Sequence, residues 1–452
     1  MLANQSLLLD LYELTMAQCY FFYKRESYAT FDLFVRDFPA RRSYLVAAGL
    51  GDILDFVTNL RFGSEDIRFL EGLHKFKPEF LDWLRNFKFS GDIWAMPEGT
   101  VFFPNEPIIR VTAPLIEAQL LESFFLNTIN LQTMIASKAA RIVSAAQGRQ
   151  VFDFSFRRTH GPEAGLKVAR ACYIAGCAAT SNVLASKLYG IPAVGTMAHS
   201  FVMSFSKELA SFDAYANNFP DQTILLVDTY DTYKGIFNAI KVGLSLQKKG
   251  FQLKGIRLDS GDIVRLSKFA RKKLDAAGLR YVKIVASGNL DEFKIAELIN
   301  RKAQVDSFGV GTNMGTSSDA PCLDVIYKLC EVSDANKNFL PTMKLSKGKV
   351  TFPGRKQVYR FRDKQGRFIK DILVLEREQL KGEPLLIKVV EKGRLIYSPL
   401  SLADIRQKLN ASLANFPKEL FSLSARYNYP VLISSRLKGL MQNLIGQLAK
   451  RQ

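Results

Sequence analysis

Between residues 150 and 330, short apolar runs alternate with longer amphipathic stretches. The runs cover residues 151–154, 191–194, 223–227, 255–258, 281–286, 306–310 and 323–329, and each is followed by small or polar residues and then by a helical pattern. Strands that alternate with helices form βα units around a parallel sheet. Six or seven consecutive units predict a (β/α) barrel, and the lack of a Gly-rich dinucleotide fingerprint after the first run disfavours a Rossmann fold.

The two ends of the chain follow other patterns. Residues 7–20 are predicted to form an amphipathic helix and residues 29–36 a largely apolar strand. Residues 115–146, rich in Leu, Ala and Ile, predict one long helix. After about residue 340 the pattern indicates β-hairpins, followed by helices between residues 401 and 450. The sequence therefore predicts an α/β protein with more than one domain.

Composition limits the class of protein. The 452 residues are too many for one compact core, and 48% hydrophobic with 23% charged residues is typical of a globular protein. No apolar run reaches 18 residues, so we expect no membrane-spanning helix. The first ten residues lack the basic start and apolar length of a signal peptide. Five scattered cysteines without a Cys-x-x-Cys pair disfavour a disulfide framework or a structural zinc site, and favour the cytoplasm.

The net charge of +19 is concentrated at one end of the chain. Residues 341–452 contain 23 Lys and Arg but only 8 Asp and Glu, so most of the surplus lies there. A nucleic-acid-binding face should interleave cations with aromatic side chains, and charge without such a module is weak evidence. We interpret the segment as hairpins with a solvated face and do not expect a nucleic-acid partner. Contact with anionic ligands, a membrane or nucleic acid is the alternative.

Polar clusters follow the predicted strands of the barrel. They occupy residues 157–161, 195–200, 228–231, 257–262, 287–289 and 309–315. Because barrel enzymes place their chemistry at the carboxyl ends of the strands, these clusters predict an active site. Loops after late strands commonly bind phosphate through backbone N–H groups. Candidates for that role are Ser287, Gly288, Gly309, Gly311 and Thr312, although glycines also serve ordinary turns.

Four aspartates lie in two neighbouring loops. Asp228 and Asp259 are nearest the strand ends and suit Mg²⁺, ribose hydroxyls or a magnesium-bound diphosphate. For Asp231 and Asp262, which stand at predicted helix starts, capping of free N–H groups is an equal alternative.

The basic side chains of the same region are few. Arg157 and Arg257 suit a carboxylate or a phosphate, and a structural ion pair with one of the aspartates is the alternative. The three histidines, His74, His160 and His199, are too dispersed for a histidine-based zinc site. His199, at a predicted helix start, suits a general base or a packed core residue.

Taken together, these motifs resemble those of the nicotinate phosphoribosyltransferases. The resemblance rests on residues 9–18, 154–158 with 161–162, 195–200, 257–262, 287–291 and 308–312, which occur in the family's order. It implies a barrel of the type II phosphoribosyltransferase kind over residues 121–340. It also implies an α/β sandwich domain built from residues 1–120 and 341–452, and a homodimer with a shared active site.

The resemblance implies a reaction as well. Nicotinate and 5-phosphoribosyl 1-pyrophosphate would give nicotinate mononucleotide and pyrophosphate, the first step of NAD salvage from nicotinate. Mg²⁺ would be the cofactor and ATP a co-substrate, hydrolysed through a transient phosphohistidine at His199.

Roles carry over to the matching positions. Phe154 and, from the partner subunit, Tyr12 would enclose the pyridine ring, with Ser181 and Thr196 also lining the substrate site. Arg157 and Arg257 would hold carboxylate and phosphates, and Asp228 and Asp259 would hold ribose, Mg²⁺ or diphosphate. The remaining positions, which would hold the phosphoribosyl 5-phosphate, are Ser287, Gly288, Gly309, Gly311 and Thr312.

Three other functions remain open. The related nicotinamide enzyme has an acidic residue where this chain has Ser181, so the neutral side chain favours nicotinate over nicotinamide. Quinolinate phosphoribosyltransferase shares the fold but uses no phosphohistidine, so His199 argues against it. The distant alternative is a non-catalytic, phosphate-binding barrel whose basic tail contacts nucleic acid.

Overall fold

The computed structural model describes residues 5–334, 338–346 and 351–449. Residues 1–4, part of the segment used above to argue against a signal peptide, therefore lie outside the described residues. The chain divides into unit 1, residues 1–137 and 322–452, and unit 2, residues 138–321. The division falls inside α6 (Glu122–Ala145), so one helix contributes residues to both units. Each unit is described by itself below.

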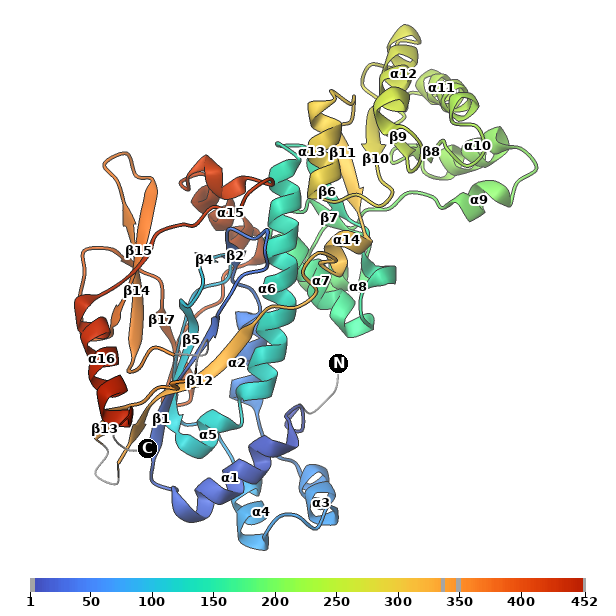
Figure 1. The fold of residues 1–452 in the computed structure, drawn as a ribbon. Helices are drawn as coiled ribbons and strands as arrows, with labels where there is room; N and C mark the ends of the chain where they lie inside the picture. The colour runs from blue at the N-terminus through green and yellow to red at the C-terminus, as the bar shows by residue number, and fades with distance from the viewer. Residues whose placement is uncertain (1–4, 335–337, 347–350, 450–452) are drawn as a thin grey trace. The chain divides into compact units, whose positions relative to one another are not determined.

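The main sheet of unit 1 is antiparallel and draws strands from both ends of the chain (Figure 1). Its order is β13 (Phe339–Pro341), β12 (Val325–Ser333), β1 (Tyr28–Val35), β5 (Pro107–Pro114), β3 (Asp92–Ala95), β17 (Ile387–Glu391) and β18 (Arg394–Leu395). Strand β1 is buried along almost its whole length and is paired on both edges, with β12 on one side and β5 on the other. The sheet is therefore complete only when strands from both chain ends are present.

Smaller elements complete unit 1. A second sheet has the order β16 (Glu383–Pro384), β14 (Lys356–Arg362), β15 (Phe368–Leu375) and β19 (Val431–Ile433), and β2 (Leu45–Val46) pairs with β4 (Val101–Phe102). The helical elements of unit 1 other than α6 are α1 (Leu11–Tyr23), α2 (Leu50–Asn59), α3 (Ser64–Gly72), α4 (Pro78–Arg85), α5 (Leu115–Gln119), α15 (Leu402–Leu413), the 3₁₀ turn η2 (Lys418–Phe421) and α16 (Ser435–Ala449).

Several cations of the basic C-terminal segment are used inside unit 1. Arg360 on β14 lies opposite Asp371 on β15 and binds it with two hydrogen bonds, of 2.9 and 2.5 Å, while both side chains are buried. The same guanidinium donates to the Val101 carbonyl at 2.8 Å. Lys356 forms a buried ion pair of 2.8 Å with Asp32 on β1. The basic segment is therefore an integral part of unit 1 and not an appended tail.

Unit 2 is built on a parallel sheet (Figure 1). Its strand order is β7 (Ala179–Thr180), β6 (Gln150–Asp153), β11 (Ser307–Val310), β10 (Lys283–Ala286), β9 (Gly255–Leu258) and β8 (Ile224–Leu226). The helical elements are the 3₁₀ turn η1 (Phe156–Arg158), α7 (Pro162–Ile174), α8 (Val183–Tyr189), α9 (His199–Met203), α10 (Glu208–Asn218), α11 (Thr232–Lys248), α12 (Ile263–Ala276), α13 (Glu292–Asn300) and α14 (Thr312–Gly315). The predicted α/β class with consecutive parallel βα units is confirmed, as a curled half-barrel sheet.

Helix starts in unit 2 are fixed by aspartates. The side chains of Asp231, Asp262 and Asp291 each accept a hydrogen bond from a backbone N–H three residues later, at 2.8–3.1 Å. These bonds satisfy N–H groups that a first helical turn leaves free. The capping interpretation of Asp231 and Asp262 is therefore confirmed.

Three expectations about elements were wrong. Residues 191–194 form no regular strand but a single bridge between Ala193 and Thr180, because Pro192 cannot donate to a ladder. The run 323–329 belongs to β12 in the antiparallel sheet of unit 1 and not to the parallel sheet. The helix expected over 115–146 is divided into α5 and α6 by a turn at Leu120 and Leu121, which are both buried and continue the apolar pattern.

Within the described residues, no helix combines the length and the apolar character needed to span a membrane. All five cysteines are free thiols, and three of them are buried.

Candidate functional site

The side chains at the carboxyl ends of the parallel strands of unit 2 gather around Arg257, which lies on β9. Its Nε donates to Ser287 Oγ at 2.8 Å, Nη1 donates to Thr196 Oγ1 at 3.0 Å, and Nη2 donates to Asp259 Oδ1 at 2.7 Å. Only about an eighth of the side chain is exposed. One guanidinium thus holds three loops together. For Arg257, the sequence allowed either an anion-binding role or a structural ion pair with an aspartate, and the ion pair with Asp259 is present.

Asp259 is the carboxylate at the centre of the cluster. Its Oδ1 also accepts the Ser287 hydroxyl at 2.5 Å, and its backbone N–H donates to Asp228 at 2.9 Å. Burial alone would raise the pKa of Asp259, but the hydrogen bonds from Ser287 and Arg257 outweigh it and hold the pKa below its ordinary value. The site therefore contains a stable anion.

His199 lies beside this anion as the first residue of α9. Its Nδ1 is 3.1 Å from Thr229 Oγ1, and its Nε2 is 3.8 Å from Asp259 Oδ2. With the proton on Nε2 facing the carboxylate, the Nδ1 lone pair accepts from the Thr229 hydroxyl. The imidazole is 42% exposed. It is therefore oriented at both nitrogens and still open to a ligand.

Asp228 follows β8 and has one satisfied and one unsatisfied oxygen. Its Oδ2 accepts from the Asp259 N–H and from Ser260 Oγ at 2.6 Å. Its Oδ1 is buried and has no hydrogen-bond partner among the described residues. The described residues contain no group of three or more His, Cys, Asp or Glu that could bind a metal ion. Two carboxylates nevertheless suit Mg²⁺, which commonly binds one or two carboxylates together with substrate phosphates and water.

Phe154 supplies the apolar surface of the site. Its ring centroid is 5.7 Å from the Arg257 guanidinium carbon. A Cβ atom at Gly309 would lie 2.5 Å from Cε2 of the same ring, so only glycine leaves room for it. Packing against Phe154 therefore explains the glycine at position 309, and its expected phosphate-binding role stays a prediction.

The backbone at Gly288 can be formed only by glycine, because it lies against the loop that carries Asp259. Its φ is +92°, and a Cβ atom there would lie 1.9 Å from the Asp259 carbonyl oxygen. The neighbouring Ser287 N–H donates to the Leu258 carbonyl at 2.9 Å, which continues the ladder beyond the strand end. The close approach of these two loops places Ser287 Oγ between Arg257 and Asp259.

Other predicted residues lie outside the hydrogen bonds around Arg257. Arg157, in η1, and Ser181, after β7, are exposed. Gly311 precedes α14 and Thr312 begins it. Tyr12 lies on α1 in unit 1, so its predicted role in a subunit-shared site stays a prediction.

Three polar residues of the site were missed. Thr229 contacts His199, and Ser260 contacts Asp228. Asp153, at the end of β6, is buried and accepts from Ser155 and Thr180, so it joins the ends of two strands. Burial raises the pKa of Asp153 although these hydrogen bonds oppose the shift. A charged residue within an apolar strand was the available signal.

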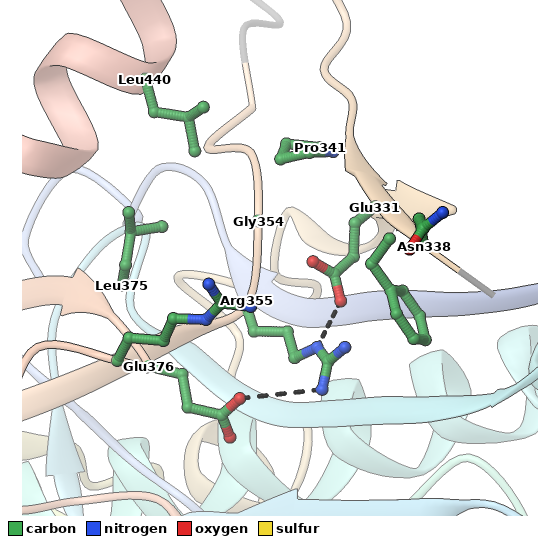
Figure 2. Close-up of a pocket in the computed structure, with 10 residues that line it drawn as sticks. Glu331, Asn338, Pro341, Gly354, Arg355, Leu375, Glu376 and Leu440 are labelled. Atoms are coloured by element: carbon green, nitrogen blue, oxygen red, sulfur yellow. Dashed lines mark hydrogen bonds and ion pairs between the residues drawn. The ribbon is translucent and has the colours of Figure 1, made fainter. Parts of the chain in front are cut away.

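Unit 1 contains a cavity of its own, of about 500 Å³ (Figure 2). Figure 2 shows Arg355 between Glu331 and Glu376, and both contacts are ion pairs. None of the predicted site residues lines this cavity. Arg355 is balanced by two carboxylates of the protein itself, and no predicted site residue lies here, so we do not assign the cavity to the reaction.

Three family models match the chain in order. They are the nicotinate phosphoribosyltransferase N-terminal domain over residues 7–130, the nicotinate phosphoribosyltransferase family over 149–350, and the C-terminal domain over 379–441. The chain is 47% identical over 445 residues to nicotinate phosphoribosyltransferase pncB2 of Mycobacterium tuberculosis, covering 97% of this chain and 94% of that protein. It is 38% identical to nicotinate phosphoribosyltransferase of Bacillus subtilis, covering 95% and 93%.

Solved structures agree with these relatives. The crystal structure of human nicotinic acid phosphoribosyltransferase superposes with a TM-score of 0.86 at 30% identity, covering 97% of this chain and 100% of that chain. A nicotinate-nucleotide pyrophosphorylase from Pyrococcus furiosus gives a TM-score of 0.73 at 26% identity, covering 92% and 97%. The described cluster lies within the match to the central family model. The chain therefore belongs to the nicotinate phosphoribosyltransferase family.

Proposed function

We propose that this chain joins nicotinate to 5-phosphoribosyl 1-pyrophosphate, forming nicotinate mononucleotide and pyrophosphate. The observation that carries the proposal is the cluster of Arg257, Asp259 and Ser287 beside His199. Family membership supplies the substrates, and the cluster supplies fixed donors and a fixed anion where the strands end. Ser181, neutral and exposed after β7, is consistent with a carboxylate-bearing base.

The chemical step needs charge stabilisation more than proton transfer. The N-glycosidic bond forms from the pyridine nitrogen to C1 of the ribose as the C1–O bond to pyrophosphate breaks, and pyrophosphate leaves with the electron pair. Fixed donors aimed at developing charge are the main source of rate enhancement in such a step. Arg257 is held in place by three side chains, so it loses little orientational freedom when it meets an anion. The pyridine nitrogen needs positioning, which the Phe154 ring would provide.

We propose that ATP is coupled through His199. The γ-phosphorus would form a bond to an imidazole nitrogen as its bond to the ADP oxygen breaks, and water would later release phosphate. Asp259 keeps a negative charge near Nε2, which favours a proton on that nitrogen and leaves the Nδ1 lone pair as the nucleophile. The Thr229 hydroxyl, which donates to that lone pair and orients the ring, would release it as the phosphorus approaches.

Mg²⁺ fits the two carboxylates. Asp228, with its unpartnered buried Oδ1, and Asp259 would hold the ion together with substrate phosphates and water. When bound, Mg²⁺ would neutralise phosphate charge. The protein's own part is to keep Asp228 in place through Ser260 and the Asp259 N–H.

The decisive assay measures product from nicotinate, 5-phosphoribosyl 1-pyrophosphate and Mg²⁺, with and without ATP, and with nicotinamide and quinolinate in parallel. We expect nicotinate mononucleotide, with ATP raising the rate. Equal or faster turnover of nicotinamide would contradict the substrate assignment. Product from none of the three bases would contradict the function.

We also propose a cytoplasmic homodimer in which Tyr12 of one subunit completes the site of the other. Leu8, Leu11 and Tyr12 are each more than 40% exposed on the N-terminal segment of unit 1, as expected of a surface that another chain covers. The five free cysteines suit a reducing compartment. Mixing Tyr12→Ala and His199→Ala proteins tests the shared site, with the ATP-stimulated rate as the readout. ATP stimulation that returns in the mixture supports the shared site, and a mixture without it after subunit exchange contradicts it.

A further inference from the structure

Unit 2 contains a cavity at the ends of the strands opposite the Arg257 cluster, where the strands begin. It has a volume of about 660 Å³ and is lined by residues 148–150 at the start of β6, residues 303–307 at the start of β11, and basic side chains beside β10. Because the strands are parallel, their amino ends share one edge of the sheet and the Arg257 cluster lies at the other. The cavity is therefore separate from the site described above.

The lining is strongly basic. Arg149, Arg271, Arg280 and Lys283 face a single lining carboxylate, Asp306. Lys283 is paired with Asp306 at 3.1 Å. Arg271 is paired at 2.8 Å with an aspartate of its own helix. Arg149 and Arg280 have no ion-pair partner among the described residues, so the cavity keeps at least two uncompensated guanidinium groups.

Two of the four cations are held in place by backbone carbonyls. Arg271 donates from Nη1 and Nη2 to the carbonyls of Val282 and Leu279, at 2.7 and 3.1 Å. Arg149 Nε donates to the Val305 carbonyl at 3.0 Å, which leaves its terminal nitrogens free to meet a ligand. For Arg149 and Arg271, a ligand would thus meet guanidinium groups that are already in place, which lowers the ordering cost of binding.

We propose that this cavity binds an oligophosphate chain. Guanidinium groups bind phosphate through paired N–H donors, and the volume lies within the range of small-molecule sites. None of the described residues that line it is aromatic, so it offers no ring on which a nucleobase could stack. In the cavity of unit 1, by contrast, Arg355 is already balanced by Glu331 and Glu376 (Figure 2).

Footprinting of lysines tests this site without relying on catalysis. Lys283 is 66% exposed and lines the cavity, whereas Lys272 is exposed on the same unit and does not. Both are acetylated with an amine reagent in the presence of increasing tripolyphosphate and quantified by mass spectrometry. We expect the acetylation rate of Lys283 to fall about tenfold at saturation and that of Lys272 to stay unchanged. Phosphate binding at the Arg257 cluster would not protect Lys283.

Variants assign the protection to the cavity. Arg280→Gln removes an exposed cation that has no ion-pair partner among the described residues, so the fold should survive, which circular dichroism checks. Loss of one charge-assisted contact should raise the tripolyphosphate concentration for half-protection about tenfold. Lys248→Gln removes an exposed cation outside the cavity and should leave half-protection unchanged. Equal protection in both variants would overturn the proposal.

A comparison of ligands shows whether the cavity recognises the phosphate chain alone or a nucleotide that carries it. Tripolyphosphate and ATP should protect Lys283 with similar half-protection concentrations, and inorganic phosphate should be weaker because it carries one phosphate group. ATP that protects more than tenfold better would overturn the assignment to the chain alone. A single-stranded oligonucleotide that protects better than tripolyphosphate, or no protection by any ligand, would overturn it as well.

Discussion

At the scale of single residues, the carboxylate of Asp259 serves several neighbours at once. It fixes Arg257, accepts from Ser287 and faces His199. Because these donors hold the pKa of Asp259 below its ordinary value, the anion persists over the whole neutral range. An acid limb in the pH–rate profile near neutrality should therefore not come from this carboxylate.

Thr229 should matter for ATP coupling. Replacing it by Val removes the hydroxyl that orients Nδ1 of His199, and we expect the ATP-dependent rate to fall about tenfold, the effect of one lost hydrogen bond to a charged or reacting group. Thr229→Ser keeps the hydroxyl and should retain most of the stimulation.

His199→Ala should abolish ATP stimulation and leave slow ATP-independent product formation. Steady-state rates with and without ATP separate these outcomes, and equal stimulation in Val and Ser variants would contradict the role.

Gly288 should be irreplaceable for a steric reason. In Gly288→Ala the new methyl group would collide with the Asp259 carbonyl, so the loop must move and activity should fall by at least tenfold. Gly278→Ala is the matched control, because Gly278 has φ of +77° but no atom within 4 Å of its would-be Cβ. The control should cost about 1 kcal/mol of stability and keep its activity. Similar activity losses in both variants would contradict the steric explanation, because positive φ is the feature that the two positions share.

At the scale of elements, the sequence pattern located the parallel strands better than it separated the roles of their polar residues. The run 228–231 contains both Asp228, which holds the cluster, and Asp231, which caps α11. Either role puts an aspartate after a strand, so residue type alone cannot distinguish them. The two aspartates differ in the direction of their side chains, since Asp231 accepts a hydrogen bond from its own helix and Asp228 accepts one from the neighbouring loop. Tertiary contacts likewise decided the helix break at Leu120 and the sheet to which β12 belongs.

Glu13 on α1 should make unit 1 sensitive to pH. Burial raises the pKa of Glu13 to about 7, although hydrogen bonds from Ser123 oppose the shift. A carboxyl group whose folded pKa is raised is protonated more readily in the folded state, so stability should fall as pH rises from about 4.5 to about 7. Glu13→Gln removes this loss, which is at most about 3 kcal/mol. We expect the variant to gain in Tm over the wild type at pH 8 and not at pH 4.5, whereas the exposed Glu26→Gln should show no such change.

Arg360 should be essential for the β14–β15 hairpin. Arg360→Met leaves Asp371 buried without its partner, which typically costs about 3–5 kcal/mol. Arg362→Met, two residues further along the same strand, breaks an exposed pair with Glu383 and should cost less than about 1 kcal/mol. Urea denaturation measures both. Equal losses would contradict the importance of burial.

At the scale of the whole molecule, unit 1 is assembled from both ends of the chain, and unit 2 is inserted between them in the sequence. Family resemblance indicated this arrangement, whereas hydrophobic periodicity did not, because pairing between β1 and β12 is a contact between segments about 300 residues apart. Periodicity reports only local neighbours. The same limit applies to the basic segment, whose buried ion pairs with Asp32 and Asp371 are invisible to a count of charges.

Deletion of residues 341–452 should therefore unfold unit 1. It removes β17 from its place beside β3 and removes the β14–β15 hairpin. We expect the truncated protein to be insoluble or strongly proteolysed, and not merely less basic. Soluble yield and limited proteolysis measure this outcome. A truncated chain that stays folded would show that the segment is peripheral after all.

The divided origin of unit 1 has a consequence for synthesis on the ribosome. Strand β1 emerges early, but its neighbour β12 follows only after residue 325, about 15–60 s later at usual elongation rates of about 5–20 residues per second. Unit 2 is complete before either β12 or β17 has been translated. During this interval one edge of β1 has no partner strand, because only β5 has been translated, and an unpaired strand edge is open to pairing with other chains. Rare codons placed within the unit 2 coding region would lengthen this exposure and lower the yield of soluble protein.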